Sequence, residues 1–322
     1  MNEIGRKITD KLIEINGSAD FTIVFLPYKR SMWNSMESVY EECIASGADA
    51  HCMPIPYYRK KTDNEIDYID SDFDLFGDIA ERVELLDELS PRFIAIQYQY
   101  DGNNKVTGML PEYYTANLKS KYNCDIVMLP YGIPWIDEPQ DSDYLPHGIV
   151  SVDYIFTCSE TARQNGIRTW AYYNIDMTDR IFAFGSPKLD MMAKAPEEIP
   201  DEWQPIIGDR VVTLVCNSLG AFLGEPYERI NLYRQYVVRE VDRDKAVIFR
   251  PHPLLRTTIK SMRPDTEACY NKLLAQFRRL PHVIIDESEY LERVVGIADH
   301  LISDPSSVVK MWQVTGKTYE VM

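Results

Sequence analysis

The sequence lacks an apolar run long enough to cross a membrane. No stretch approaches the roughly 18 consecutive apolar residues of a membrane span. The first residues, MNEIGRKITDKLIEINGS, also contain no apolar core of the kind found in a secretory signal. These absences predict a cytoplasmic protein.

Positive charge is scarce in the chain. There are 34 Lys and Arg residues against 50 Asp and Glu residues, which gives a formal net charge of −16. Proteins that grip a nucleic-acid backbone usually carry a basic face, so we expect no nucleic-acid partner. An anionic ligand must instead be held locally, by backbone amides and a few well-placed cations.

Paired cysteines and glycine-rich phosphate loops are missing as well. The 6 cysteines include no Cys-x-x-Cys pair, so we expect reduced thiols in the core and neither disulfides nor a zinc site. No Gly-x-Gly-x-x-Gly and no Gly-x-x-x-x-Gly-Lys-[Ser/Thr] motif occurs, which excludes the usual dinucleotide fingerprint and the P-loop. No carboxylates or histidines cluster at metal-ligand spacing, and we expect no cofactor.

What the chain does contain is an alternation of short apolar runs and longer helical patterns, which is typical of parallel sheets wrapped by helices. Its 322 residues exceed one average domain and predict two. We therefore predict an α/β fold with two Rossmann-like domains that face each other across a cleft. They should cover residues 1–190 and 210–322, joined by a linker, 191–209, that holds three prolines and five acidic residues.

The apolar runs predict the individual elements. Strands are expected in the first half at residues 21–26, 48–55, 93–98, 124–129, 153–158 and 180–185. In the second half, strands are expected at 210–218, 245–250, 282–286, 299–303 and 318–322, alternating with helices at 226–241, 264–280, 288–298 and 305–316. A helix capped by Ser31 is expected to reach residue 46, and the acidic segment between Tyr57 and Phe76 is expected to be a loop.

Unusual polar residues cluster after the predicted strands. This matters because ligands of open parallel sheets bind beyond the carboxyl ends of the strands. The candidates in the first half are Lys29 and Arg30 after one strand and Tyr131 and Gly132 after another; those in the second half are Asn217, Ser218, Arg250, His252, Asp304, Ser306 and Ser307.

The run Arg250-Pro-His252-Pro is the most specific of these. Proline cannot donate to a sheet ladder and restricts the residue before it to extended angles, so the two prolines should end the strand and fix the directions of Arg250 and His252. A guanidinium offers a fork of donors suited to phosphate oxygens, and an imidazole can exchange a proton near neutral pH. We interpret the pair as a phosphate site with an acid or base.

Asp304 and the two serines after Pro305 have two interpretations. Asp304 followed by proline is a common helix start, with the carboxylate as cap. A helix start with hydroxyls and free amides is also an anion site, which would place Ser306 and Ser307 on a phosphate. Asp304 itself would repel a diphosphate, so its functional role would be that of a base or a hydroxyl acceptor.

An ordered set of short motifs resembles one known family. The motifs are LPYKRSMWNSMESVYEE, MPIPYY, YDGNNKVTG, LPYGIP, GSPKLD, FRPHPL, SMRPDTEACYNKLL and DPSSVVKMWQVTGK, spread over residues 20–322. Together they resemble the bacterial CDP-glycerol glycerophosphotransferases of teichoic-acid synthesis. Each piece alone is weak, and the specificity lies in their order.

The resemblance implies a GT-B architecture, with an N-terminal acceptor domain and a C-terminal domain that binds the CDP-activated donor. It implies transfer of glycerol phosphate, or a similar polyol phosphate, to a hydroxyl acceptor with release of CMP. It places Arg250, His252, Ser306 and Ser307 at the donor diphosphate. We add Asn217 and Ser218 there, and Lys29, Arg30 and Gly132 on the acceptor side. The protein would then work at the inner face of the membrane, with at most weak peripheral association.

One departure from the family concerns the base. Better-known members carry Trp-His-Gly-Thr-Pro where this chain has Leu129-Pro-Tyr131-Gly-Ile-Pro. A tyrosine with an ordinary pKa near 10 is a poor base at neutral pH. Either Asp304 or His252 takes that role, or the acceptor differs, or transfer to a teichoic acid has been lost.

Two alternatives keep the same fold. A glycosyltransferase or epimerase that uses a UDP-sugar would need the same anion site at the strand ends. A non-catalytic protein that binds a nucleotide diphosphate would keep the donor pocket without the acceptor base.

Overall fold

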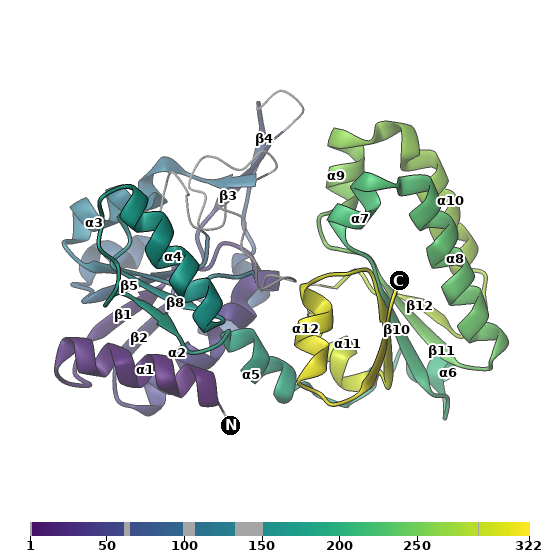
Figure 1. The fold of residues 1–322 in the computed structure, drawn as a ribbon, viewed down its shortest axis with the longest axis horizontal. Coiled ribbons are helices and arrows are strands. Elements are labelled where there is room, and N and C mark those ends of the chain that lie inside the picture. Colours follow the sequence, from purple (N-terminus) through teal and green to yellow (C-terminus); the bar gives the residue numbers. More distant parts are fainter. Residues whose placement is uncertain (1, 61–64, 99–106, 133–150, 289) are drawn as a thin grey trace. The chain divides into compact units, whose positions relative to one another are not determined.

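The structure, a computed structural model, describes residues 2–60, 65–98, 107–132, 151–288 and 290–322 (Figure 1). The chain divides into two compact units, Met1–Met191 and Met192–Met322. Each unit contains a parallel sheet with helices packed on it, so the predicted α/β fold with two Rossmann-like units is confirmed. The cleft, the linker and the division of roles between the domains stay predictions.

The N-terminal unit is built on a six-stranded sheet in the order β2-β1-β5-β7-β8-β9, with every pairing parallel. Its strands are β1 (Thr22–Phe25), β2 (Asp49–Cys52), β5 (Phe93–Ile96), β7 (Asp125–Met128), β8 (Tyr154–Thr157) and β9 (Ile181–Ala183). Consecutive strand residues enter different cores: Ile23 belongs to one apolar cluster and Val24 to another. This alternation follows from the two-residue period of a strand and explains why both faces need helices.

Helices cover both faces of that sheet. The elements are α1 (Glu3–Asn16), α2 (Glu37–Ala45), α3 (Thr115–Tyr122), α4 (Glu160–Tyr172) and α5 (Pro187–Ala193). Ile8 of α1 and Val39 of α2 pack in one cluster, whereas Leu118 of α3 and Trp170 of α4 pack in the other. Helix α1 can approach α2 closely because Gly5 has no side chain. A Cβ at this position would lie only 2.4 Å from the Ser38 carbonyl oxygen.

The segment from Tyr57 to Phe76 was predicted as a loop, and this is wrong. It contains β3 (Tyr57–Lys60) and β4 (Ile66–Asp70), which pair antiparallel and form a three-stranded sheet with β6 (Thr107–Met109). Tyr57 and Met109 of this sheet are buried in an apolar core, and Arg59 adds a contact between β3 and β4, with 2.8 Å from its Nη2 to Asp70 Oδ2. The helix predicted over 31–46 is also split, into the 3₁₀ helix η1 (Arg30–Ser35) and α2, and Ser31 lies inside η1 and is not its cap.

His51 on β2 lies between two carboxylates. Its Nδ1 is 3.0 Å from Glu81 and its Nε2 is 3.2 Å from Asp49. Burial lowers the pKa of His51, but the hydrogen bonds with Glu81 and Asp49 outweigh burial, and the net pKa is raised. The charged ring therefore stabilises the fold fully below the unfolded pKa of about 6.5, and this contribution is lost as the pH rises through the higher folded pKa.

We expect His51→Gln to lower the free energy of unfolding by up to about 1 kcal/mol at pH 6, because the pair is partly exposed. The loss should shrink by pH 9, where the wild-type ring is neutral. Urea denaturation at the two pH values tests this, and an equal loss at both would contradict it.

The C-terminal unit is a five-stranded parallel sheet in the order β12-β11-β10-β13-β14. The strands are β10 (Val212–Cys216), β11 (Ala246–Arg250), β12 (Val283–Ile285), β13 (His300–Ser303) and β14 (Thr318–Val321). The helices are α6 (Gln204–Ile207), α7 (Leu219–Gly224), α8 (Pro226–Asp242), α9 (Leu255–Met262), α10 (Glu267–Phe277), α11 (Leu291–Ile297) and α12 (Ser307–Gln313). All five predicted strands and four predicted helices of this half are confirmed, whereas α6, α7 and α9 were not predicted.

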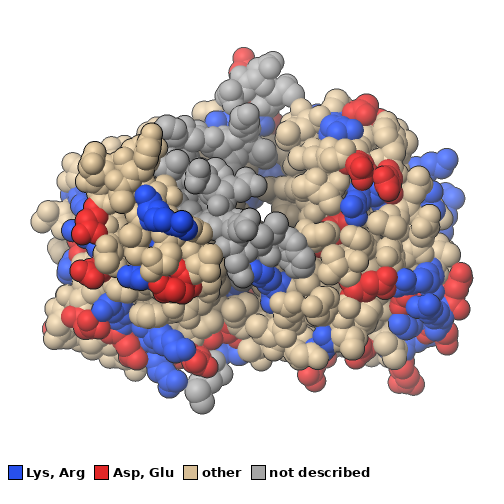
Figure 2. All heavy atoms as spheres, viewed as in Figure 1, with Lys and Arg blue, Asp and Glu red and all other residues tan. Residues whose placement is uncertain are grey.

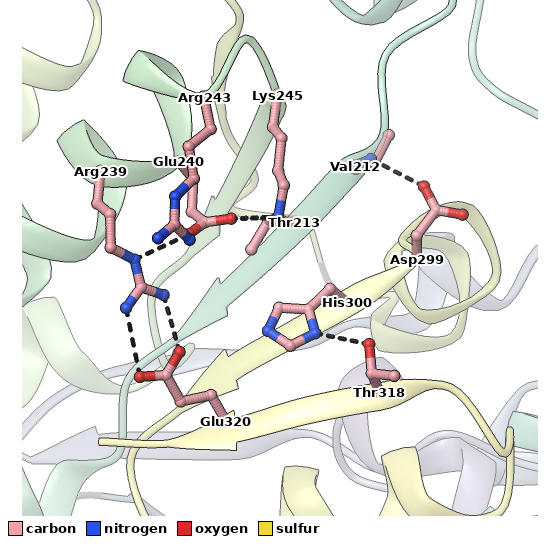
Figure 3. Close-up of polar contacts among 10 residues, drawn as sticks. All are labelled: Val212, Thr213, Arg239, Glu240, Arg243, Lys245, Asp299, His300, Thr318 and Glu320. Carbon is pink, nitrogen blue, oxygen red and sulfur yellow. Dashed lines mark hydrogen bonds and ion pairs between the residues drawn. The ribbon is translucent and has the colours of Figure 1, made fainter.

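In this unit α8 and α10 lie along one side of the sheet (Figure 1). Tyr233 of α8 and Phe277 of α10 share an apolar cluster with Phe249 of β11. The amino and carboxyl ends of the strands carry different polar side chains. At their amino ends, Glu240 at the end of α8 accepts hydrogen bonds from Arg239, Arg243, Lys245 and Thr213 (Figure 3).

The thiols differ in part from expectation, because not all of them lie in the core. Cys43, Cys52, Cys124 and Cys216 are buried free thiols, but Cys269 is exposed. On the face in Figure 2, Lys and Arg side chains lie among Asp and Glu side chains, so the negative net charge does not gather into one patch there. Within the described residues, no helix is both long and apolar enough to span a bilayer.

Candidate functional site

The carboxyl ends of three neighbouring C-terminal strands lie level. Cys216, the last residue of β10, pairs with Arg250 of β11 on one side and with Ser303 of β13 on the other. The residues that follow each strand therefore leave the sheet at the same edge. We call Asn217, Ser218, Arg250, His252 and Asp304 the strand-end cluster.

Asn217 and His252 are joined directly. The Asn217 side chain accepts a hydrogen bond at Oδ1 from the His252 backbone N–H at 2.7 Å. Asn217 is 3% exposed, and its Nδ2 is buried without a partner among the residues that the structure describes. A buried donor without a partner costs about 1–3 kcal/mol, so Asn217 presents a donor whose natural partner is a ligand or an ordered water.

The backbone also selects the tautomer of His252. The Leu254 N–H donates to His252 Nδ1 at 3.1 Å, so Nδ1 must be an acceptor. The neutral ring then carries its proton at Nε2. His252 is therefore arranged as a hydrogen-bond donor, whereas a base acting at Nε2 would need the other tautomer.

Arg250 is the cation of the cluster and is only 6% exposed. Its Nη1 donates to the Asp286 carboxylate and to Ser288 Oγ, the latter at 3.3 Å. Asp286 is 2% exposed and follows β12, the neighbour of β11. The guanidinium is thus held in one place, and its charge is balanced before any ligand arrives.

Asp304 is fully buried and accepts three hydrogen bonds. Its donors are the Ser218 backbone N–H at 2.8 Å, the Tyr233 hydroxyl at 2.5 Å and Arg229 Nη1 at 3.0 Å. Burial and the neighbouring Asp304 charge raise the pKa of Tyr233, so its hydroxyl stays protonated and donates. These contacts favour a structural role for Asp304 over the role of a base.

The helix after β13 begins later than expected. Ser306 is the N-cap of α12 and Ser307 its first residue, so the interpretation of Asp304 as the helix cap is wrong. Ser306 Oγ instead contacts Ser303 Oγ at 3.3 Å. Ser218 is also a cap, because its Oγ accepts from the Ala221 N–H at the start of α7.

The N-terminal candidates are held by their own unit. Lys29 is 7% exposed, donates from Nζ to the Tyr57 hydroxyl at 3.2 Å, and lies 4.2 Å from the centre of the Tyr57 ring. Arg30 donates its backbone N–H to Asp72 at 2.9 Å, and its guanidinium lies over the Phe76 ring. Burial and the Asp72 charge raise the pKa of Tyr57, which therefore remains a donor to Asp72.

Tyr131 and Gly132 end the described part of their segment. Tyr131 is half-buried, and the Lys188 ammonium lies 5.8 Å from the centre of its ring. Gly132 is exposed, and a Cβ there would meet nothing within 4 Å. The structure thus joins Tyr131 to a buried cation, and the acceptor-side and catalytic roles of all these residues stay predictions.

A pocket of about 450 Å³ also lies in the C-terminal unit. It is lined by residues of the segment 196–201 and of the start of α11, including Glu198, Asp201 and Glu292. None of the predicted site residues lines it. Its three carboxylates outnumber its one cation, Arg293, so its charge does not suit a phosphate.

The partners of the cluster were missed by sequence reasoning. Asp286 had the same signal as Arg250, since it follows an apolar strand directly, but it was taken as the end of that strand. Arg229 and Tyr233 gave no signal, because charged and aromatic residues four apart are ordinary on a helix surface.

Comparison with known proteins finds likeness in structure. No protein-family profile matches the sequence, and no curated protein matches it. The UDP-GlcNAc 2-epimerase from Methanocaldococcus jannaschii superposes with a TM-score of 0.57 at 15% identity, over 93% of this chain and 83% of that one. The Neisseria meningitidis UDP-GlcNAc 2-epimerase bound to UDP-GlcNAc gives 0.56 at 13% identity, over 93% and 82%.

The wall teichoic acid polymerase TagF, soaked with CDPG, gives a TM-score of 0.50 at 16% identity, over 98% of this chain and 72% of that one. At these identities the likeness establishes the fold alone, which is GT-B-like. The expected fold class is confirmed, and these comparisons do not establish the family.

Proposed function

We propose that this chain is an enzyme that uses a nucleotide-activated donor and holds the donor's phosphates at the strand-end cluster. The observation that carries the proposal is the buried Asn217 Nδ2, a donor without a partner among the described residues. It is fixed beside His252 at the edge that Arg250 shares. Phosphoryl transfer needs mainly positioning and charge stabilisation, which oriented donors provide.

The preferred donor is CDP-glycerol or a related CDP-polyol. The ordered motifs support this choice, because they run through both units. In the reaction, a hydroxyl acceptor attacks the phosphorus that carries the glycerol, and the bond from that phosphorus to the CMP leaving group breaks. Asn217, Arg250 and His252 would donate to phosphate oxygens.

Other residues keep proposed roles in the reaction. Ser218, Ser306 and Ser307 would extend the phosphate site, and Lys29, Arg30 and Gly132 would face the acceptor. With Asp304 occupied by three donors and His252 arranged as a donor, Tyr131 beside Lys188 becomes the stronger candidate base.

A UDP-sugar enzyme is the second candidate. It is favoured by the fold neighbours that act on or bind UDP-GlcNAc. The same oriented donors would serve a UDP diphosphate, so the donor must be identified by experiment.

Thermal unfolding in the presence of CDP-glycerol, CDP-ribitol, UDP-GlcNAc, CMP and UDP tests the proposal. A ligand at about 100 times its Kd should add about 2.7 kcal/mol to the free energy of unfolding, which raises the Tm by several degrees. We expect the cytidine compounds to give the largest shift. Larger shifts with the uridine compounds would select the second candidate, and no shift with any of the five would contradict both.

A matched pair of variants tests whether the ligand binds at the strand-end cluster. Asn217→Ala should abolish most of the ligand-induced shift, whereas Asn231→Ala, on the exposed face of α8, should leave it unchanged. Release of CMP with a panel of hydroxyl acceptors then separates an enzyme from a protein that only binds the nucleotide.

A further inference from the structure

The carboxylate of Asp286 is itself held rigidly. Its backbone N–H donates to the Phe249 carbonyl at 2.9 Å, which continues the ladder beyond β12. Its Oδ1 accepts from the Ser288 N–H at 3.1 Å, and its Oδ2 accepts from Arg250 Nη1. Both oxygens are thus used, and the carboxylate cannot turn away from the guanidinium.

This arrangement divides the donors of Arg250. The hydrogen bonds that the structure gives its guanidinium, to Asp286 and to Ser288, both leave from Nη1. A guanidinium is planar, so fixing Nη1 also fixes the directions of Nε and Nη2. Within the part of the chain that the structure describes, these two groups have no hydrogen-bond partner, so they are left for a ligand at the strand-end cluster.

We propose that Asp286 is a positioning residue of the donor site: it orients Arg250 so that Nε and Nη2 meet a phosphate of the nucleotide. The inference rests on the proposed function, because it needs a phosphate ligand at the cluster. Arg250 then contributes mainly directed hydrogen bonds, since the buried pair carries no net charge.

Calorimetric titration with CDP and UDP tests this in the full chain. We expect Arg250→Ala and Asp286→Ala each to weaken binding about tenfold, which is within the coupling range of contacting charged pairs. Asp286→Asn keeps an acceptor and should stay within about threefold of the wild type. Glu287→Ala removes the neighbouring exposed partner of Arg256 and should bind as the wild type does.

Two further variants separate positioning from folding. If Asp286 acts through Arg250, Asp286→Ala should cause no additional loss in an Arg250→Ala background, whereas a general structural defect would add to it. Asp286→Glu keeps the charge but moves the carboxylate by one methylene, so it should fold and still bind about threefold or more weakly.

The outcomes distinguish this inference from the proposed function. If the wild type binds neither nucleotide, both fail. If it binds but Arg250→Ala binds equally well, Arg250 lies outside the site and only the positioning role is overturned. Wild-type affinity of Asp286→Ala or Asp286→Glu, with Arg250→Ala weakened, also overturns the positioning role alone.

Discussion

Replacing Glu240 by alanine is expected to lower the free energy of unfolding by about 2–4 kcal/mol. Glu240 is 1% exposed and accepts from Lys245 at 2.6 Å, Arg239 at 2.9 Å and Arg243 at 3.1 Å (Figure 3). Removing one partner of a buried ion pair costs about 3–5 kcal/mol, because the remaining charge is left uncompensated. The cost is smaller here, since the three cations keep some contact with water.

The effect should depend on pH with a definite sign. Burial raises the pKa of Glu240, but the hydrogen bonds with Lys245 and Arg239 outweigh burial, and the net pKa is lowered. The stabilisation is therefore present above the unfolded carboxyl pKa of about 4.3 and is lost as the pH falls through the lower folded pKa. Urea denaturation at pH 7 and at pH 3.5 should show a smaller difference from the wild type at the lower pH.

Glu228→Ala is the matched control, because Glu228 is an exposed residue of the same helix. We expect a change within about 0.5 kcal/mol. A similarly small change for Glu240→Ala would show that the cations are satisfied by water and that the buried carboxylate is not needed.

His252→Ala should lower turnover about a hundredfold with the preferred donor. The structure arranges His252 as a donor at Nε2, because Nδ1 accepts from Leu254. Glutamine can place an amide N–H near the position of Nε2, so His252→Gln should recover much of the lost turnover. Steady-state CMP release measures both variants.

The glutamine variant decides between two roles. If His252 is the base, the amide cannot replace it, and His252→Gln should be as inactive as His252→Ala. His300→Gln is the control: His300 lies at the amino end of β13, where its Nδ1 contacts Thr318, and this variant should keep wild-type turnover (Figure 3).

The parallel sheets could be predicted because their strands are buried on both faces. A run such as Ala246-Val-Ile-Phe249 is continuously apolar, and such runs can be recognised directly in a sequence. The antiparallel sheet could not be predicted in this way. All five residues of β4 carry exposed or half-buried side chains, and Tyr57 and Arg59 of β3 find their partners in acidic residues, so the segment has the composition of a loop.

Sequence alone could predict only those residues of the candidate site that directly follow a parallel strand. Asn217, Arg250 and His252 follow apolar strands directly, and a parallel sheet brings such positions to one edge. The ion partners of Arg250 and Asp304 are fixed by packing between elements distant in the sequence. Asp286 is 36 residues from Arg250, and Arg229 is 75 residues from Asp304, and no local pattern records either pairing.

The start of helix α1 is capped by a residue of α5, the last helix of its own unit. The Asp190 carboxylate of α5 accepts from the backbone N–H groups of Ile4 and Gly5, over separations of 186 and 185 residues. During synthesis, the Asp190 carboxylate can therefore cap α1 only after almost the whole unit has left the ribosome. Because contacts of such long range form slowly, we expect nascent fragments that stop short of α5 to leave the start of α1 frayed and open to proteases.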